Sequence, residues 1–406
     1  MKLQVDTDRA IADLRALARF GQLEKGVNRR ALSADDIEAR RWLETRMQQA
    51  GLQTTIDEVG TLSGRTPDCE RYILIGSHTD TVPKGGWLDG SMGVIFGLEI
   101  ARSWMALSST PSIGIEVLSF SDEEGRFGGL MGSGVYVGQQ TAAAARALRA
   151  EDGKTLAEEV DRAGWSSTPA LSLNEQKHCA YFEAHIEQGP ILETEGTRIG
   201  VVTEIVGVER MRIEFNGRAE HAGTIPMAMR QDASAAVFSF AHEFVQMCRE
   251  EGGPNTVWNL GHAEFEPGAF NVVCGHAVLY VEYRDGDPKI LQRIRESIGE
   301  LVIEAGARHR VSFDTYQQMR TEPAIMDEKL MTMIEGAAHD CGTTSKRMPS
   351  GAGHDAMLIA PRIPTAMLFV PSIDGRSHDV SEDTSVDDIA LGLTVLAGAV
   401  ERCLIV

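Results

Sequence analysis

The chain has 406 residues, of which 43% are hydrophobic and 24% are charged, an ordinary composition for a soluble globular protein. Its formal net charge is -20, with 59 acidic and 39 basic residues. A field of that sign repels phosphate backbones and anionic lipids, so we expect neither nucleic acid nor a membrane surface as a partner.

The cysteines and the apolar runs indicate where the protein resides. The six cysteines are scattered and form no C-x-x-C pair, a pattern that favours free thiols in a reducing compartment over a disulfide framework. No apolar run approaches the roughly 18 to 20 residues needed to span a bilayer, and the N-terminus shows no signal-peptide core. The sequence therefore predicts a cytoplasmic protein.

The first predicted elements are two helices followed by two strands. Apolar residues at helical spacing predict helices over 8–20 and 33–51, and a strand is expected over 54–58. Residues 72–75 (Y-I-L-I) form a short continuous apolar run, which suits a strand buried on both faces. Gly76 is expected to end that strand.

A parallel α/β unit is predicted from the next segments. A mostly apolar helix over 93–106 and a core strand over 113–120 follow the strand at 72–75, and this order is typical of a βαβ unit. The alternation returns near the C-terminus. There we expect a helix over 329–341, a strand over 365–370 and a closing helix over 386–405.

Residues 207–319 form a separable block. The expected order is strand, helix, strand, strand, helix, strand, over 211–216, 233–248, 256–263, 277–283, 291–305 and 311–317. This is the split-βαβ, ferredoxin-like pattern. Two domains are also expected from the length of the chain. We therefore predict one α/β domain made of residues 1–206 plus 320–406, interrupted by an inserted domain over 207–319.

Five side chains are candidate metal ligands: His78, Asp89, Glu124, His185 and His378. Each has a commoner structural alternative on its own. A single histidine after a strand usually makes a structural hydrogen bond, an Asp-Gly pair is usually a turn, and a Glu-Glu pair is usually solvated. The set is more informative, because loops that follow parallel strands converge at one edge of the sheet.

Two carboxylates with three imidazoles suit a binuclear site. Two divalent ions roughly 3.5 to 4 Å apart need a bridging carboxylate and nitrogen or oxygen ligands on either side. Such ligands suit zinc, manganese, cobalt or nickel. Asp80 is placed to hold the second imidazole nitrogen of His78, and Glu123 remains free to act as a general base on water.

Six segments together resemble a known family. They are G-S-H-T-D-T-V-P-K-G-G-W-L-D-G (76–90), S-D-E-E-G-R-F (121–127), H-I-E-Q-G-P (185–190), A-E-H-A-G-T-I-P-M (219–227), S-G-A-G-H-D-A (350–356) and S-H-D (377–379). In this order they resemble the amidase, hydantoinase and carbamoylase branch of the co-catalytic metallopeptidases related to aminoacylase. The resemblance covers nearly the whole chain.

The resemblance implies roles for the metal ligands and the catalytic residues. His78, Asp89 and His185 would hold one ion, and Asp89, Glu124 and His378 the other, with Asp89 as the bridge. Glu123 would deprotonate the attacking water and later protonate the leaving nitrogen. Asp80 is counted with the catalytic residues.

The resemblance also implies a composite site in a homodimer. His221 would stabilise the tetrahedral intermediate from the partner subunit, and the inserted domain would serve as dimerisation and lid domain. Substrate contacts would come from Gln188, Asn271, Arg284, Gly351 and Gly353, with Arg284 forking onto a substrate carboxylate. The role of His354 stays open.

The implied fold is a zinc-aminopeptidase-like α/β domain, with a mixed, mostly parallel sheet flanked by helices. The implied activity is hydrolysis of a linear carbamoyl or ureido C–N bond, because this branch has His185 where peptide-cleaving relatives have a carboxylate. An N-carbamoyl-L-amino acid is the expected substrate. Allantoate, a β-ureido acid, an N-acyl amino acid, and a binding protein without catalysis are the alternatives.

Overall fold

The computed structural model describes residues 2–108 and 111–405 and divides into two compact units. The first unit contains the chain up to Glu204 and from Ile325 onward, and the second contains Ile205–Ala324. Among the described residues, no helix has both the length and the apolar character that a membrane span requires.

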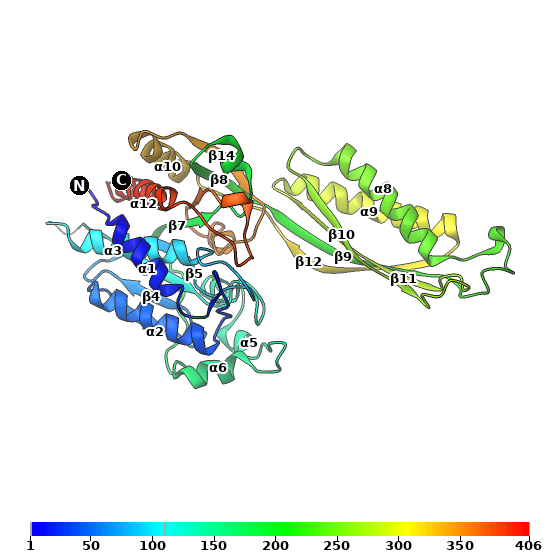
Figure 1. Ribbon diagram of the computed structural model, residues 1–406, viewed down its shortest axis with the longest axis horizontal. Coiled ribbons are helices and arrows are strands. Elements are labelled where there is room, and N and C mark those ends of the chain that lie inside the picture. The colour runs from blue at the N-terminus through cyan, green and yellow to red at the C-terminus, as the bar shows by residue number, and fades with distance from the viewer. Residues whose placement is uncertain (1, 109–110, 406) are drawn as a thin grey trace. The chain divides into compact units, whose positions relative to one another are not determined.

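The first unit alternates strands and helices (Figure 1). Its elements up to the second unit are α1 (Thr7–Leu17), β1 (Gln22–Leu23), β2 (Gly26–Val27), α2 (Ala34–Gln49), β3 (Gln53–Ile56), β4 (Leu62–Arg65), β5 (Arg71–His78), α3 (Ser91–Met105), β6 (Ile113–Phe120), α4 (Met131–Tyr136), α5 (Ala142–Arg146), α6 (Leu156–Ala163), β7 (His178–Ile186), α7 (Ile191–Glu195) and β8 (Ile199–Ile205). Its later elements are β13 (Ala324–Ile325), α10 (Glu328–Asp340), β14 (Ser345–Ser350), α11 (Ala356–Ile359), β15 (Thr365–Val370), η2 (Ile373–Gly375) and α12 (Val386–Ile405).

A mixed sheet of nine strands among the described residues is the centre of this unit, with the order β13-β8-β15-β7-β5-β6-β4-β3 and β14 beside β8. The four central strands β15, β7, β5 and β6 are parallel, whereas β8, β4 and β3 join antiparallel. Helices α3, α10 and α12 pack on the central strands, as do the short α4 and α11. The predicted α/β class with a mixed sheet is confirmed.

Strand β5 is longer than predicted and includes its glycine. The strand continues from Arg71 through Gly76 to His78, so the expectation that Gly76 ends it was wrong. A Cβ added at Gly76 would lie 2.1 Å from the Leu118 carbonyl oxygen on β6, so glycine permits this close approach. His78 is therefore fixed in register, opposite Phe120 of β6.

The register places several strand ends at one edge of the sheet. His78 is the last residue of β5, and the segment with Glu123 and Glu124 follows the end of β6. His185 lies one residue before the end of β7, opposite Phe369 of β15. Strand β7 was not among the predicted elements. Parallel strands thus deliver their carboxyl ends together, where open α/β sheets bind ligands.

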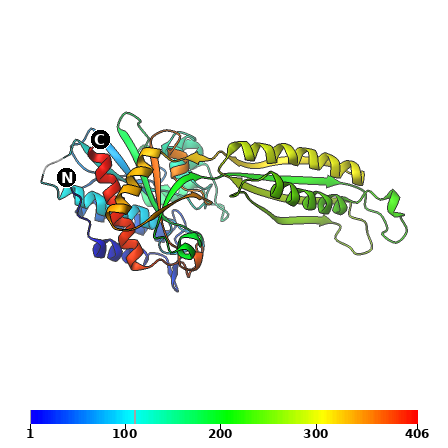
Figure 2. The same cartoon turned by 90° about the horizontal axis from the view of Figure 1, so that it is seen from above.

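The second unit has the predicted order of elements: β9 (Gly207–Asn216), η1 (Met227–Met229), α8 (Ala233–Glu251), β10 (Val257–Glu266), β11 (His276–Asp285), α9 (Pro288–His309) and β12 (Ser312–Thr321). Its strands pair antiparallel in the order β10-β11-β9-β12, which is the ferredoxin-like topology. Helices α8 and α9 run side by side along the sheet (Figure 2). Apolar residues of both helices and of the sheet form the core, including Phe240 and Ile298.

Candidate metal centre

Six acidic and imidazole side chains meet at the carboxyl edge of the central strands. Ligand atoms within 4.8 Å of one another form three groups among the described residues, each buried wholly or in part: His78 with Asp89 and His185, His78 with Glu123 and Glu124, and Asp89 with Glu124 and His378. All five predicted metal ligands therefore lie together, and so does the predicted base. The groups share members, which makes them one continuous cluster.

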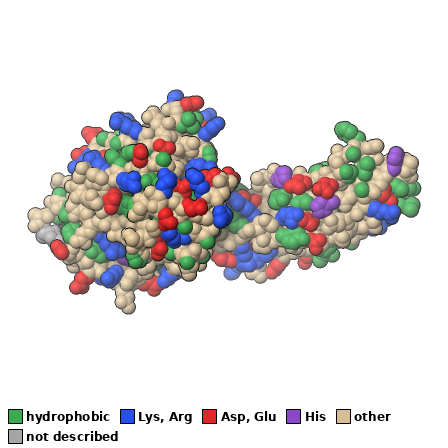
Figure 3. Space-filling view, turned by 90° about the horizontal axis from the view of Figure 1, so that it is seen from below, with side chains coloured by type: hydrophobic (Ala, Val, Ile, Leu, Met, Phe, Trp, Pro, Cys, Tyr) green, Lys and Arg blue, Asp and Glu red, His purple; other side chains and the backbone are tan. Residues whose placement is uncertain are grey.

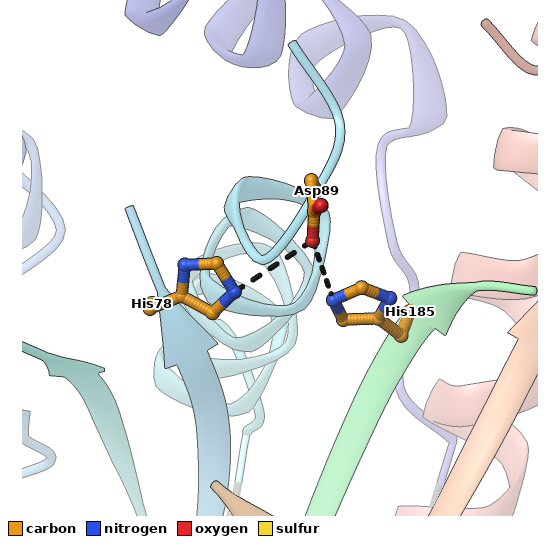
Figure 4. Close-up of side chains that lie close together, drawn as sticks. All are labelled: His78, Asp89 and His185. Atoms are coloured by element: carbon orange, nitrogen blue, oxygen red, sulfur yellow. Dashed lines mark ion pairs between the residues drawn. The ribbon is translucent and has the colours of Figure 1, made fainter. Parts of the chain in front are cut away.

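Asp89 lies at the centre of the cluster and presents one oxygen to each side. Its Oδ1 is 3.0 Å from Nε2 of His185 and 3.7 Å from Nε2 of His78, and both rings point at it (Figure 4). Its Oδ2 is 3.3 Å from Nε2 of His378, which is also 3.4 Å from Oε2 of Glu124. This division of the two oxygens is what a bridging carboxylate needs.

Backbone carbonyls fix the tautomers of the two buried histidines. Nδ1 of His78 lies 2.9 Å from the Asp80 carbonyl oxygen, and Nδ1 of His185 lies 2.9 Å from that of Ile186. A carbonyl only accepts, so each Nδ1 carries the proton and each Nε2 presents a lone pair, as in metal-ligating histidines. The Gly90 N–H donates to Nε2 of His185 at 3.1 Å, which agrees with this assignment.

The spacing of these lone pairs fits a cation between them. Ligand atoms held roughly 2.0 to 2.1 Å from a tetrahedral zinc ion lie about 3.3 Å from one another. The nitrogen–oxygen distances around Asp89 run from 3.0 to 3.7 Å. In addition, Oε1 of Glu124 is buried without a hydrogen-bond partner. The residues present therefore fit a divalent metal ion.

The electrostatics of the cluster also favour a cation. Burial and the charges of Asp89 and Asp80 raise the pKa of Glu124 to about 10, and burial and the charge of Glu124 raise the pKa of Glu123 well above its usual range. Burial opposes ionisation of Asp89 as well, but in the metal-free protein the imidazoles of His185 and His378, when protonated at Nε2, hold its pKa well below the usual value. A positive ion among these carboxylates would relieve their repulsion and favour the ionised forms.

Local backbone geometry explains why Asp89 reaches the cluster. Gly90 follows it with φ 62°, in the left-handed region that glycine adopts without strain, and helix α3 begins at the next residue. A Cβ at Gly90 would lie 2.4 Å from the His78 ring. The Asp89-Gly90 pair is thus a turn, and that turn allows the His78 ring to pack against it.

Comparison with known proteins assigns the family. The family model described as peptidase family M20/M25/M40 matches residues 74–402. The chain belongs to peptidase family M20/M25/M40. An N-carbamoyl-L-amino-acid amidohydrolase of Rhizobium meliloti is 36% identical over 404 residues, covering 98% of this chain and 96% of the relative. An allantoate amidohydrolase of Escherichia coli K12 is 33% identical over 378 residues and covers 92% of both chains.

A solved structure extends the M20 assignment to the fold. The crystal structure of an amidase of the hydantoinase/carbamoylase family from Burkholderia phymatum superposes with a TM-score of 0.92 at 41% identity, covering 100% of this chain and 99% of that one. The resemblance of the six sequence segments to the hydantoinase and carbamoylase branch is thereby confirmed.

Asp80 occupies a different place in this M20 chain from the one expected. Its carbonyl oxygen, not its carboxylate, accepts the His78 Nδ1–H, because the carboxylate Oδ1 is 3.9 Å from that nitrogen. The carboxylate Oδ2 instead accepts the Glu124 N–H at 3.2 Å. Asp80 therefore ties the segment after β5 to the segment after β6. A catalytic effect of Asp80 stays a prediction.

Arg40 was not singled out in the sequence, yet it supports the same region. Its guanidinium is fully buried and donates to the carbonyl oxygens of Ser119, at 3.1 Å, and Phe120, at 2.9 Å, at the end of β6. It also lies 3.9 Å from the Asp80 carboxylate. No local pattern could have indicated this role, because Arg40 reads as a polar position of a surface helix.

Two of the predicted substrate contacts in the first unit lie in open positions, and Gln188 lies in the cluster. Gln188 has φ 58°, and its Nε2 donates to Asp89 Oδ2 at 3.1 Å, while its Oε1 is buried without a partner. Gly351 and Gly353 are exposed, and a Cβ at either would meet nothing within 4 Å. Packing within this chain therefore does not require glycine at those two positions.

His354, whose role the sequence left open, supports a proposed ligand. Its ring is buried and packs edge-on against that of His185, with centroids 4.5 Å apart, and its Nε2 lies 2.9 Å from Ser350 Oγ. Burial lowers the pKa of His354 well below its usual value, so the ring is neutral. A neutral ring adds no positive charge beside a metal site.

The remaining predicted residues belong to the second unit. His221 is exposed, and its Nδ1 accepts the Gly223 N–H at 3.0 Å. It lies beside the Asn271 segment, since the Ala222 N–H donates to the Asn271 carbonyl at 2.9 Å. Arg284 lies on β11, and its Nε donates to Glu282 at 2.9 Å. The proposed contacts of these three side chains with substrate stay predictions.

Proposed function

We propose that this protein is a metal-dependent amidohydrolase that cleaves the carbamoyl C–N bond of an N-carbamoyl-L-amino acid, releasing the amino acid, ammonia and carbon dioxide. The observation that carries the proposal is the cluster around Asp89, in which each carboxylate oxygen faces a separate set of ligand atoms and Glu123 lies beside them. The relative from Rhizobium meliloti, which is named for this activity, aligns with 98% of this chain.

We assign two divalent ions to the cluster, each of them zinc, manganese, cobalt or nickel. His78 and His185 would hold one ion and Glu124 and His378 the other, with Asp89 between them. When bound, such ions lower the pKa of water and polarise a carbonyl oxygen. Availability of metals decides which ion is used, since this donor set accepts several.

The chain's own residues would move the protons. Glu123 Oε2 lies 3.6 Å from Nε2 of His78, and the side chain is 11% exposed, so Glu123 borders the cluster while remaining accessible to water. In its ionised form it would take a proton from the attacking water and deliver it to the leaving nitrogen, as a general base and then a general acid. One water is consumed for each carbamoyl group, and the free amine results.

Six further residues are suited to hold the substrate. The buried Gln188 Oε1 without a partner is an acceptor suited to the N–H of a carbamoyl group. Arg284 would bind the α-carboxylate through its guanidinium fork, and Gly351 and Gly353 would offer backbone contacts. We also propose that His221 and Asn271 contact the substrate, with His221 stabilising the tetrahedral intermediate.

A homodimer is part of the proposal, supported by the internal geometry of the second unit. Arg284 pairs with Val208 at one end of the sheet, whereas His276 pairs with Asn216 at the other. The ladder continues past that second end to the bridge between His221 and Val272. Eight residues from His276 to Arg284, at about 3.4 Å each, span roughly 27 Å. One small substrate cannot reach Arg284 and His221 of the same chain.

The surface of the second unit also suits a second copy of the chain. Within the part of the chain that the structure describes, strand β10 pairs with β11 alone and is an edge strand. Hydrophobic side chains are exposed over this unit (Figure 3). They are Met227, Met229, Phe238, Val257, Phe270, Ile303, Phe313, Tyr316 and Met319. These exposed side chains are available to pack against a second copy of the chain.

Mixed dimers test the composite site. We expect the variants His221→Ala and Arg284→Ala to be nearly inactive alone. Co-refolding equal amounts should restore about a quarter of the wild-type activity, because half of the dimers are mixed and each has one intact site. Turnover of N-carbamoyl-L-amino acids checks this. If each site used one chain only, no activity would return, and a fully active monomer would exclude the dimer.

A substrate panel tests the activity itself. We expect kcat/KM to be highest for an N-carbamoyl-L-amino acid, when compared with allantoate, N-carbamoyl-β-alanine and an N-acetyl amino acid, each with added zinc, manganese, cobalt or nickel. Allantoate is the main alternative because the Escherichia coli relative carries that name. Higher kcat/KM for allantoate would replace the proposed substrate, and turnover of none with any metal would support a binding protein.

We also propose a cytoplasmic location for the protein. The six cysteines are all free in the structure, which agrees with a reducing compartment. Fractionation of the native host, with the protein detected by an antibody, would check the location.

A further inference from the structure

A buried carboxylate outside the proposed ligand set joins the two loops that carry Asp89 and His378. Glu382 is 2% exposed. Its Oε1 accepts the backbone N–H of Leu88 at 3.2 Å and that of Asp89 at 3.1 Å. Its Oε2 accepts the hydroxyl of Ser377 at 2.9 Å. The same carboxylate therefore holds the backbone of Asp89 and the side chain of Ser377, the residue before His378.

The His378 side of the cluster needs such support more than the other side. The His378 side chain is 51% exposed, whereas those of the other four proposed ligands are at most 9% exposed. His378 also has φ 55°, a left-handed conformation that is costly for a residue with a Cβ. Neither a strand nor a buried helix fixes it, because it lies in the segment between η2 and α12.

The fit around Glu382 is close. A Cβ added at Gly86 would lie 1.9 Å from the Glu382 carboxyl group, so the segment before Asp89 must have glycine there for the carboxylate to approach. Ser377 Oγ also lies 3.3 Å from Asp89 Oδ2. The contacts thus run from Glu382 through Ser377 to the oxygen of Asp89 that faces His378.

We propose that Glu382 is a positioning residue that sets the second ion site, formed by Asp89, Glu124 and His378. This inference rests on the proposed binuclear centre. Glu382 holds the backbone of Asp89 and the Ser377 hydroxyl, so that Asp89 Oδ2 and His378 Nε2 are at the separation one ion needs. Groups that orient metal ligands in this way typically contribute about 10- to 100-fold to metal affinity.

Three variants of the full-length protein test the role of Glu382. Glu382→Ala removes every contact of the carboxylate. Glu382→Gln keeps them in another form, since the amide oxygen accepts both backbone N–H groups and the amide nitrogen donates to Ser377 Oγ. Glu99→Gln is the matched control. Glu99 is also fully buried and accepts the Asp6 N–H at 2.8 Å and two arginines, but it contacts no proposed ligand.

The measurement is Co²⁺ binding to metal-free protein, by calorimetry and by the visible absorption of bound cobalt. We expect wild type to bind two equivalents. Glu382→Ala should lower the affinity for one equivalent about 10- to 100-fold and leave the affinity for the other within about threefold of wild type. Glu382→Gln should restore most of the lost affinity. Glu99→Gln should lower the thermal midpoint without changing either equivalent.

The outcomes distinguish a failure of the positioning role of Glu382 from a failure of the proposed binuclear centre. Wild type that binds fewer than two equivalents would overturn the binuclear centre itself. If wild type binds two equivalents of Co²⁺ and Glu382→Ala binds both with unchanged affinity, the positioning role alone is overturned. Equal weakening of the binding of both ions would also overturn it, as would failure of Glu382→Gln to recover the affinity. If Glu382→Ala does not fold, Ser377→Ala replaces it. This variant removes the contacts of the hydroxyl with Glu382, Asp89 and Gln188, and the same selective weakening is expected.

Discussion

Replacing Glu123 with glutamine will lower kcat about 10³-fold or more, while the two proposed ions remain bound. Glutamine has the shape of glutamate but cannot take a proton from water, and general-base catalysis typically contributes about 10²- to 10⁴-fold. The side chain is placed for this task because its Oε2 lies 3.6 Å from Nε2 of His78 at the border of the cluster. The Glu123 backbone accepts the Leu130 N–H at 3.0 Å, and this bond survives the substitution.

The metal content of the Glu123→Gln protein decides between two roles. Glu123 also belongs to a group of ligand atoms with His78 and Glu124, so it could instead hold an ion. A general base can be replaced without loss of metal, whereas a ligand cannot. Metal analysis after gel filtration, beside single-turnover kinetics, provides the measurement. Loss of an equivalent would make Glu123 a ligand, and near-normal turnover would remove it from the mechanism.

Replacing Asp89 with asparagine will weaken the binding of both proposed ions and abolish turnover. An amide has one acceptor oxygen and no charge, so it cannot present an anionic oxygen to His78 and His185 on one side and to His378 on the other. Removing one partner of a buried charge pair typically costs about 3–5 kcal/mol, which is roughly 10²- to 10⁴-fold in affinity. Calorimetric titration with zinc would show the loss in both equivalents.

His378→Ala is the matched control for the bridge. Its Nε2 faces Oδ2 of Asp89 and Oε2 of Glu124, so we expect binding of one equivalent to weaken and binding of the other to remain. If Asp89→Asn affected only one ion, Asp89 would be a terminal ligand and not the bridge. Unfolding by urea would show whether the metal-free variants fold. We expect Asp89→Asn to fold, because removal of its negative charge reduces the repulsion within the carboxylate cluster.

The sequence failed to indicate β7 for a physical reason. The strand reads H-C-A-Y-F-E-A-H-I and buries Glu183 and His185, so it has neither the alternation of an edge strand nor the apolar run of a central one. Glu183 is tolerated because its Oε1 accepts the Ser77 hydroxyl at 2.6 Å and its Oε2 accepts the Ala356 N–H at 2.8 Å. Those partners lie far along the chain, and only the folded sheet brings them together.

The sequence alone determined the order of the strands and helices and the residue types of the candidate site. Periodicity predicted the strand at 113–120 and the strand at 365–370 with their observed bounds, and it predicted the order of elements in the second unit. The six segments also indicated the family and the five candidate ligands. These properties depend on neighbouring residues, or on residue types in a fixed order, and can therefore be read along the chain.

Only the tertiary structure decided how those residues act on one another. It showed that the Asp80 backbone orients His78 while the Asp80 carboxylate holds Glu124, and that Glu382 holds Asp89 from 293 positions away. Such contacts follow from strand order and register, which place the ends of β5, β6, β7 and β15 at one edge. Hydrogen bonds between distant segments leave no periodic pattern in the sequence, because each residue fits its own helix, strand or loop whatever its distant partner is.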